Sequence, residues 1–130
     1  MAGCRIFIDV VVVSEFINAY ARSQWNASGK PGNFKQFRNS PAFQPIAGDI
    51  ADAVRLILKH CQRLESGFAS LDMNTVLDDY AAGNTDFNDK IIAALCQEKG
   101  FKLVTDDSDF AGQALPILTA NRRMLKATAP

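Results

Sequence analysis

The sequence predicts an α/β fold in which crossover helices connect the strands of a parallel sheet. In the second half of the chain, apolar helical segments alternate with short strands rich in Leu, Val and Ile. Near the start, a β-branched and aromatic segment at residues 5–8 directly precedes a long amphipathic stretch. With 130 residues and a hydrophobic content of 48%, we expect a single domain over residues 1–130.

The first half is predicted to contain one strand and two long helices. Residues 5–8 form the strand, and Asp9 can cap a helix that continues to about residue 25. After a Gly- and Pro-containing loop, residues 34–45 are irregular, with room for a short helical turn. Apolar residues at helical spacing predict the longest helix over about residues 46–65, ended by the Ser-Gly pair that follows.

The second half is predicted to alternate helices with short extended segments. Gly83 and Gly100 end the two helices, and Asp72 or Asn74 caps the first of them. The predicted elements in order are an extended segment at 68–71, helices at 74–82 and 87–99, strands at 101–105 and 116–119, and a helical turn at 121–126.

The charge balance argues against a general affinity for nucleic acid. Lys and Arg number 14, as do Asp and Glu, so the formal net charge is zero. Any contact with RNA or DNA must therefore come from a local basic patch.

The cysteines and the apolar runs indicate a cytoplasmic protein. Cys4, Cys61 and Cys96 are too widely spaced for a zinc motif, and their odd number leaves no closed set of disulfides. Buried free thiols fit a reducing compartment. The apolar run near the start is interrupted by Asp9 and is too short to span a bilayer, so we expect no membrane contact.

Acidic residues gather at two places where an α/β sheet brings side chains into one crevice. Asp86 and Asp89 begin an apolar helix, while Asp107 and Asp109 follow a strand. Each group has a plain structural explanation, since the first fits a capping box and the second an ordinary polar turn. The two groups together, separated by one αβ unit, favour a divalent cation held by carboxylates.

The helical position of Asp89 suggests a functional role more strongly than that of Glu15. On a helical wheel, Asp89 projects from the apolar side of its helix, which is costly unless the helix N-terminus or a metal ion compensates the charge. Glu15 lies at the edge of a polar stripe, so a solvated side chain is its default interpretation.

Four segments of the chain resemble the PIN domain family. The C-terminal half of a PIN domain is similar to Asp-Phe-Asn-Asp-Lys-Ile-Ile-Ala-Ala at 86–94, Leu-Val-Thr-Asp-Asp-Ser-Asp-Phe at 103–110 and Leu-Pro-Ile-Leu-Thr-Ala-Asn at 115–121. Residues 13–22, Val-Ser-Glu-Phe-Ile-Asn-Ala-Tyr-Ala-Arg, resemble the glutamate-bearing helix of the family.

The resemblance implies a three-layer α/β/α fold and a nuclease dependent on Mg²⁺ or Mn²⁺. Many members are VapC-like toxins of toxin–antitoxin pairs, so it also implies an RNA substrate and an antitoxin protein as partners. By matching positions, the catalytic and metal-binding acids would be Glu15, Asp89 and Asp107. Asp109 matches an auxiliary acid of some members, and Asp86 is an extra candidate ligand.

The start of the chain departs from the family pattern. PIN domains normally begin with a strand ending in Asp-Thr-Asn, some tens of residues before the glutamate, whereas Asp9 lies six residues before Glu15. Either Asp9 is that first aspartate and a further metal ligand, or residues 5–8 correspond to the second strand and the first strand is missing. A missing strand would expose sheet edges, which favours a homodimer or another protein partner. The alternative function is then an inactive PIN-like module that binds a protein.

Nucleic-acid contacts are expected in the basic segment after the glutamate. Arg22, Lys30, Lys35 and Arg38 could meet phosphates. Trp25, Phe34 or Phe37 could stack on bases, although aromatic residues more often belong to a core. His60 is not expected to act as a general base. A receiver- or Rossmann-like binding domain is disfavoured, because the chain has no Gly-rich phosphate loop.

Overall fold

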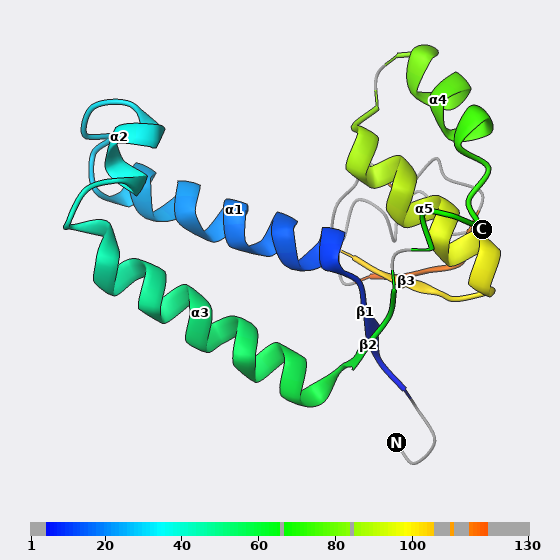
Figure 1. Cartoon of the computed structure of the whole chain (residues 1–130), viewed down its shortest axis with the longest axis horizontal. Coiled ribbons are helices and arrows are strands. Elements are labelled where there is room, and N and C mark those ends of the chain that lie inside the picture. The colour runs from blue at the N-terminus through cyan, green and yellow to red at the C-terminus, as the bar shows by residue number, and fades with distance from the viewer. Residues whose placement is uncertain (1–4, 66, 84, 106–109, 111–114, 120–130) are drawn as a thin grey trace. The chain divides into compact units, whose positions relative to one another are not determined.

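The computed structural model describes residues 5–65, 67–83, 85–105, 110 and 115–119. It divides into two compact units, Met1–Ser66 and Gly67–Pro130. The elements run in the order β1 (Phe7–Ile8), α1 (Val10–Ala27), α2 (Phe34–Arg38), α3 (Phe43–His60), β2 (Gln62–Arg63), α4 (Met73–Ala81), α5 (Phe87–Lys99), β3 (Leu103–Val104) and β4 (Ile117–Leu118) (Figure 1).

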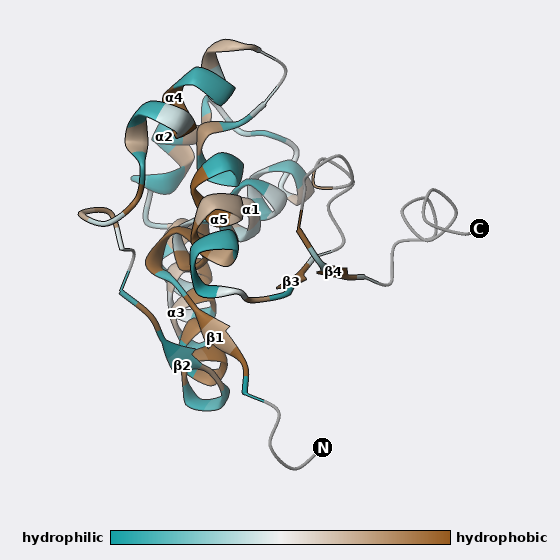
Figure 2. Ribbon diagram, turned by 90° about the vertical axis from the view of Figure 1, so that its right-hand side faces the viewer, coloured by the Kyte–Doolittle hydropathy of each residue, from teal (hydrophilic) through white to brown (hydrophobic). Residues whose placement is uncertain are grey.

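The first unit contains two long helices and a pair of short parallel strands. The helices α1 and α3 lie side by side, with α2 at one end and the strands β1 and β2 at the other (Figure 1). The buried apolar residues of these helices are Ala21, Phe37 and Ile50. The helix α3 carries both hydrophobic and hydrophilic residues (Figure 2), as expected for a helix with one buried face.

The end of α3 differs from the sequence-based expectation. The helix stops at His60 instead of continuing to about residue 65, and Gln62–Arg63 form the strand β2. The Gln62 N–H donates to the Ile6 carbonyl at 2.8 Å, and the Leu64 N–H donates to the Ile8 carbonyl at 2.8 Å. This pairing joins residues more than fifty positions apart, so the helical periodicity of the local sequence could not reveal it.

The second unit packs α4 against α5 and pairs β3 with β4. Its buried apolar residues are Val76, Ile91, Ala93, Leu95 and Phe110. The bounds of α5 agree with the predicted helix at 87–99. Gly100 ends this helix with φ at +69°, a left-handed conformation that glycine adopts without steric cost.

Other predictions for this unit have mixed outcomes. The segment predicted to be extended at 68–71 is wrong, because it forms a turn in which the Ser70 and Leu71 N–H groups donate to the Gly67 carbonyl. The predicted helical turn at 121–126 lies outside the described residues. Both described strand pairs are parallel, as predicted. That the whole chain folds as a single domain stays a prediction.

Asp72 caps α4 and provides a test of pH dependence. Its carboxylate accepts hydrogen bonds from the Thr75 hydroxyl at 2.8 Å and the Thr75 N–H at 3.2 Å. The hydroxyl bond above all, and then the backbone bond, lower the pKa of Asp72 below its usual value. Because the folded-state pKa is the depressed one, the carboxylate stabilises the fold above its unfolded pKa, and this contribution is lost as the pH falls through the folded value.

We therefore expect Thr75→Val to raise the pKa of Asp72, since it removes the hydroxyl donor but keeps the backbone N–H. An NMR titration of the Asp72 carboxyl carbon measures this shift directly. If Asp72 has the same pKa in the wild type and in Thr75→Val, the hydroxyl of Thr75 is not what lowers it.

Candidate active site

Asp9 is the buried acid of the first unit. It follows β1 directly and is 4% exposed. Its Oδ1 caps α1 by accepting a hydrogen bond from the Val11 N–H at 2.7 Å. Its Oδ2 is buried and has no hydrogen-bond partner among the residues that the structure describes. A buried carboxylate oxygen without a partner is costly, and a cation would compensate it, so this residue fits a metal ligand.

Glu15 lies on α1, about one and a half turns from the start of this helix, and is exposed. Exposure agrees with the default expectation of a solvated position. An exposed carboxylate is also accessible to a hydrated cation, which keeps several of its own water ligands in the case of Mg²⁺. Asp9 and Glu15 thus give the first unit one buried and one accessible acid.

Asp86 is the N-cap of α5, and Asp89 lies in its first turn. The Asp86 carboxylate caps the helix, accepting hydrogen bonds from the Asn88 N–H at 2.8 Å and the Asp89 N–H at 3.3 Å. This confirms the predicted capping role of Asp86. Asp89 is half-buried, as expected for a carboxylate on the apolar side of the helix. The helix N-terminus favours its negative charge.

Thr85, directly before this cap, was not singled out from the sequence. Its hydroxyl oxygen is buried and has no hydrogen-bond partner within the described part of the chain. A hydroxyl can serve as an oxygen ligand or donate to a bound phosphate. A lone Thr before a helix carries no sequence signal for such a role, because only burial makes its hydroxyl unusual.

The proposed ligand set is described only in part. Asp107 and Asp109 lie outside the described residues. Within residues 5–65, 67–83, 85–105, 110 and 115–119, no group of three or more His, Cys, Asp or Glu side chains is arranged to hold a metal ion. Asp9 and Glu15 belong to the first unit, and Asp86 and Asp89 belong to the second.

The basic residues predicted to meet nucleic acid are organised around two aromatic rings. The Arg22 guanidinium carbon lies 4.3 Å from the centre of the Phe34 ring, and that of Arg38 lies 6.0 Å from it. The Lys30 ammonium lies 5.7 Å from the Trp25 ring. These distances fall within the range of cation–π attraction.

Two further predictions in this segment have different outcomes. Lys35 is exposed on α2, where it can reach a ligand. Base stacking on Phe37 is wrong, because its ring is 5% exposed and packs against Phe43 with ring centres 5.5 Å apart. A buried ring in a core cannot present its face to a base.

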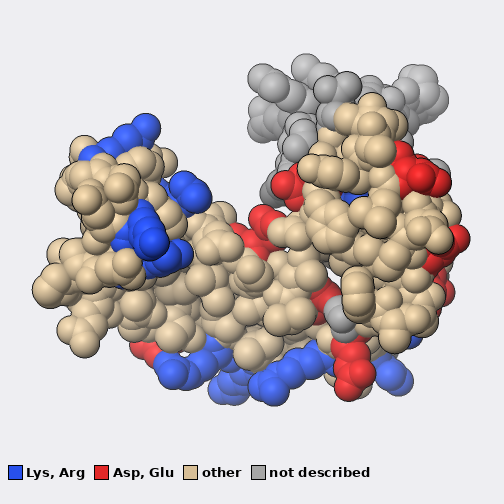
Figure 3. Space-filling view, turned by 45° about the horizontal axis from the view of Figure 1, so that its top comes forward, with Lys and Arg blue, Asp and Glu red and all other residues tan. Residues whose placement is uncertain are grey.

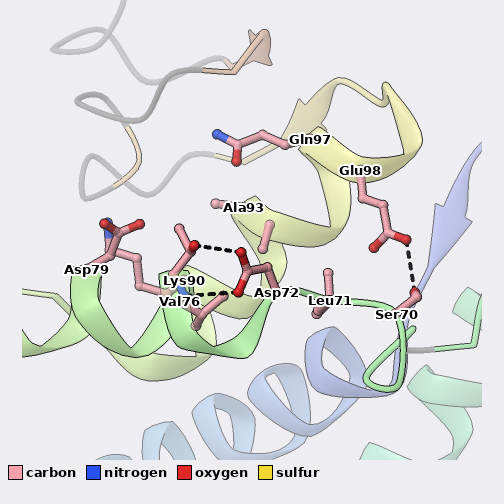
Figure 4. Close-up of a pocket in the computed structure, with 11 residues that line it drawn as sticks. Ser70, Leu71, Asp72, Val76, Asp79, Lys90, Ala93, Gln97 and Glu98 are labelled. Carbon is pink, nitrogen blue, oxygen red and sulfur yellow. Dashed lines mark hydrogen bonds between the residues drawn. The ribbon is translucent and has the colours of Figure 1, made fainter.

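The second unit contains a cavity of about 380 Å³ between α4 and α5 (Figure 4). Two of its three acidic lining residues have local partners, because Asp72 accepts from Thr75 and Glu98 accepts from the Ser70 hydroxyl at 2.9 Å. Neither Asp86 nor Asp89 lines it. The cavity is therefore a packing feature of the second unit and not the proposed metal site.

Comparison with known protein families identifies the family of this chain. The model of the PIN domain family matches residues 2–114, most of the chain. The chain belongs to the PIN domain family. Neither the search of curated proteins nor the search of solved structures gives a match.

Membership of the PIN domain family has direct consequences. The PIN fold is α/β, in agreement with the parallel strands and flanking helices described above. PIN domains are nucleases that act on RNA or DNA and typically use divalent metal ions. Among the described residues, no helix is both long enough and apolar enough to cross a membrane.

Proposed function

We propose that this PIN domain is an endoribonuclease dependent on Mg²⁺ or Mn²⁺ and the toxin of a toxin–antitoxin pair. The observation that supports a metal site most strongly is the buried Oδ2 of Asp9, which has no partner among the described residues. A carboxylate that follows a strand and keeps one buried oxygen without a hydrogen bond is well suited to a cation.

The ligand set that we propose follows the family positions. Glu15, Asp89 and Asp107 are the catalytic carboxylates, and Asp9, Asp86 and Asp109 are additional metal ligands. When bound, Mg²⁺ lowers the pKa of a coordinated water and stabilises charge that develops on the scissile phosphate.

The protein's own residues prepare this site. The hydrogen bonds from the Val11 N–H to Asp9 and from the Asn88 N–H to Asp86 fix the starts of α1 and α5. The N-terminus of α5 lowers the cost of a charged Asp89 in a half-buried position. His60 is the exposed last residue of α3, and we assign it no role in proton transfer.

RNA cleavage by the full chain tests this proposal. We expect endonucleolytic cleavage of single-stranded RNA in Mg²⁺ or Mn²⁺ and none in EDTA, because water activation depends on the metal. Expression in bacteria should arrest growth if the chain is a toxin. A purified, folded chain that leaves RNA intact in both metals would contradict the nuclease proposal.

The second candidate function is an inactive PIN module that binds a protein partner, as a toxin binds its antitoxin. The observation in its favour is the departure from the family's Asp-Thr-Asn start, since Asp9 is followed by Val10 and lies only six residues before Glu15. Thermal melting separates the two candidates. A working site should stabilise the fold by about 2.7 kcal/mol when Mg²⁺ exceeds its dissociation constant 100-fold, whereas an inactive module should melt identically with and without Mg²⁺.

A further inference from the structure

Residues 16–48 form a basic segment within a chain of zero net charge. This segment contains Arg22, Lys30, Lys35 and Arg38 but no Asp or Glu. All four cationic side chains are exposed. In Figure 3, Lys and Arg side chains gather over α2 and the adjoining end of α1, without acidic side chains among them. The local potential of this surface is therefore positive although the whole protein is neutral.

Two aromatic rings hold three of these cations in place. Trp25 and Phe34 meet edge to face, with ring centres 5.9 Å apart. Arg22 and Arg38 lie at the Phe34 ring, and Lys30 lies at the Trp25 ring. We call this set the cation–aromatic cluster, and it consists of Arg22, Trp25, Lys30, Phe34, Lys35 and Arg38.

The backbone that carries the cluster is ordered by local hydrogen bonds. Asn33 and Gln36 form a reciprocal capping box at the start of α2, with bonds of 2.8 and 3.0 Å. The Lys30 N–H donates to the Trp25 carbonyl at 3.0 Å, and the indole N–H of Trp25 donates to the Pro31 carbonyl at 3.4 Å. A surface ordered before binding loses less conformational entropy when it takes a ligand.

The chemistry of the cluster suits a single-stranded nucleic acid. Guanidinium groups match phosphate oxygens with paired N–H donors, and their flat faces stack on bases. Lys30 and Lys35 add point charges for neighbouring phosphates. Single-stranded binding surfaces combine these two elements, a row of cations and planar groups for stacking. An acidic protein would use the charges but not the stacking faces of Arg22 and Arg38.

We infer that the cation–aromatic cluster, which contains none of the proposed metal ligands, binds single-stranded RNA, with the arginines on phosphates and their planes against bases. The inference rests on the proposed function and deepens it, because it assigns the surface that binds the RNA substrate. It can nevertheless be tested separately from cleavage, since the cluster contains no proposed metal ligand.

The experiment is fluorescence anisotropy of a short labelled RNA without self-complementary sequence, measured with the full chain in EDTA at several salt concentrations. We expect Arg22→Ala with Arg38→Ala to reduce the slope of log affinity against log salt by about 1.4, which is about 0.7 per lost phosphate contact. At roughly 0.1 M salt, this change corresponds to binding about 25-fold weaker. Circular dichroism checks that the variant is folded.

A second variant avoids any disturbance of the ring contacts of the arginines. Lys30 has φ at +54°, so asparagine is the neutral replacement that best tolerates this backbone, and Lys35→Gln completes the pair. We expect the same reduction in slope. The matched control is Lys99→Ala with Lys102→Ala, two exposed cations of the second unit, whose slope should equal that of the wild type.

Each outcome decides the inference. RNA binding in EDTA with the predicted losses supports it, even if the chain fails to cleave RNA in Mg²⁺ and the proposed function falls. No RNA binding by the wild type, as expected for a surface that serves an acidic protein, overturns it. It is equally overturned if both cluster variants keep the salt slope of the wild type.

Discussion

Replacing Asp89 and Asp107 together by asparagine is expected to lower Mg²⁺-dependent RNA cleavage about 10³-fold, which corresponds to several kcal/mol of lost transition-state stabilisation. Asparagine preserves the shape of both side chains but removes their negative charge. A neutral amide oxygen is a weaker ligand for Mg²⁺ than a carboxylate, so both metal affinity and the activation of water should fall.

The same double variant should remain folded, which separates its catalytic effect from a stability effect. The Asp86 cap and its bonds to the Asn88 and Asp89 N–H groups do not involve the replaced carboxylates. The helix N-terminus favours the Asp89 charge by only about 0.3–1 kcal/mol, and asparagine gives up this small contribution. We therefore expect the melting temperature in EDTA to stay within a few degrees of that of the wild type.

The control for this variant is Asp78→Asn with Asp79→Asn on α4, which removes two exposed acids from the same unit. Cleavage by the control should equal that of the wild type. If the Asp89 and Asp107 variant cleaves RNA at the wild-type rate, these residues are not the metal ligands. A cleavage assay with Mg²⁺ titrated over a wide range also detects a variant that is only weakened in metal binding.

Leu95→Ala is expected to destabilise the fold by about 2–5 kcal/mol. Leu95 is 5% exposed in α5, and the backbone of Gly67 lies against it, because a Cβ at Gly67 would be 3.5 Å from Leu95 Cδ1. Truncation leaves a cavity that neighbouring α5 residues cannot fill without moving the helix. For a chain of 130 residues, we expect the melting temperature to fall by about 10 °C.

Ile50→Ala, in the first unit, can be compared with Leu95→Ala to test whether the two units unfold together. Ile50 is 4% exposed in α3, and its truncation should cost a similar free energy. If the chain unfolds as one domain, both variants shift a single calorimetric transition. Two transitions, each shifted by only one variant, would contradict a single domain. Leu56→Ala and Leu77→Ala, at exposed leucines of the two units, should change stability by no more than about 0.5 kcal/mol.

Local sequence signals predicted the helices of this protein well. The cap at Asp86, the apolar spacing that follows and the left-handed Gly100 placed α5 at its observed bounds. The residues that start and end a helix act through bonds within a few positions of one another. For the same reason, the capping roles of Asp9 and Asp72 were predictable.

The strand pairing was harder to predict because it depends on distant residues. Nothing in Gln62–Arg63, which is polar and exposed, indicates a strand, and the helical pattern before it favours a longer α3. The partner is β1, and its carbonyl groups decide where the helix ends. A local periodicity cannot report on hydrogen bonds formed across the whole of the first unit.

The sequence by itself determined the family, the candidate acids and the basic segment, because each of these is a pattern of residue types along the chain. Only the tertiary structure decided how the side chains are used. It buried Asp9 with an oxygen that lacks a partner among the described residues, withdrew Phe37 into the core and placed Arg22 over Phe34. Burial and cation–π contacts depend on which distant surfaces pack together, and this packing follows from the whole fold and not from the neighbouring residues.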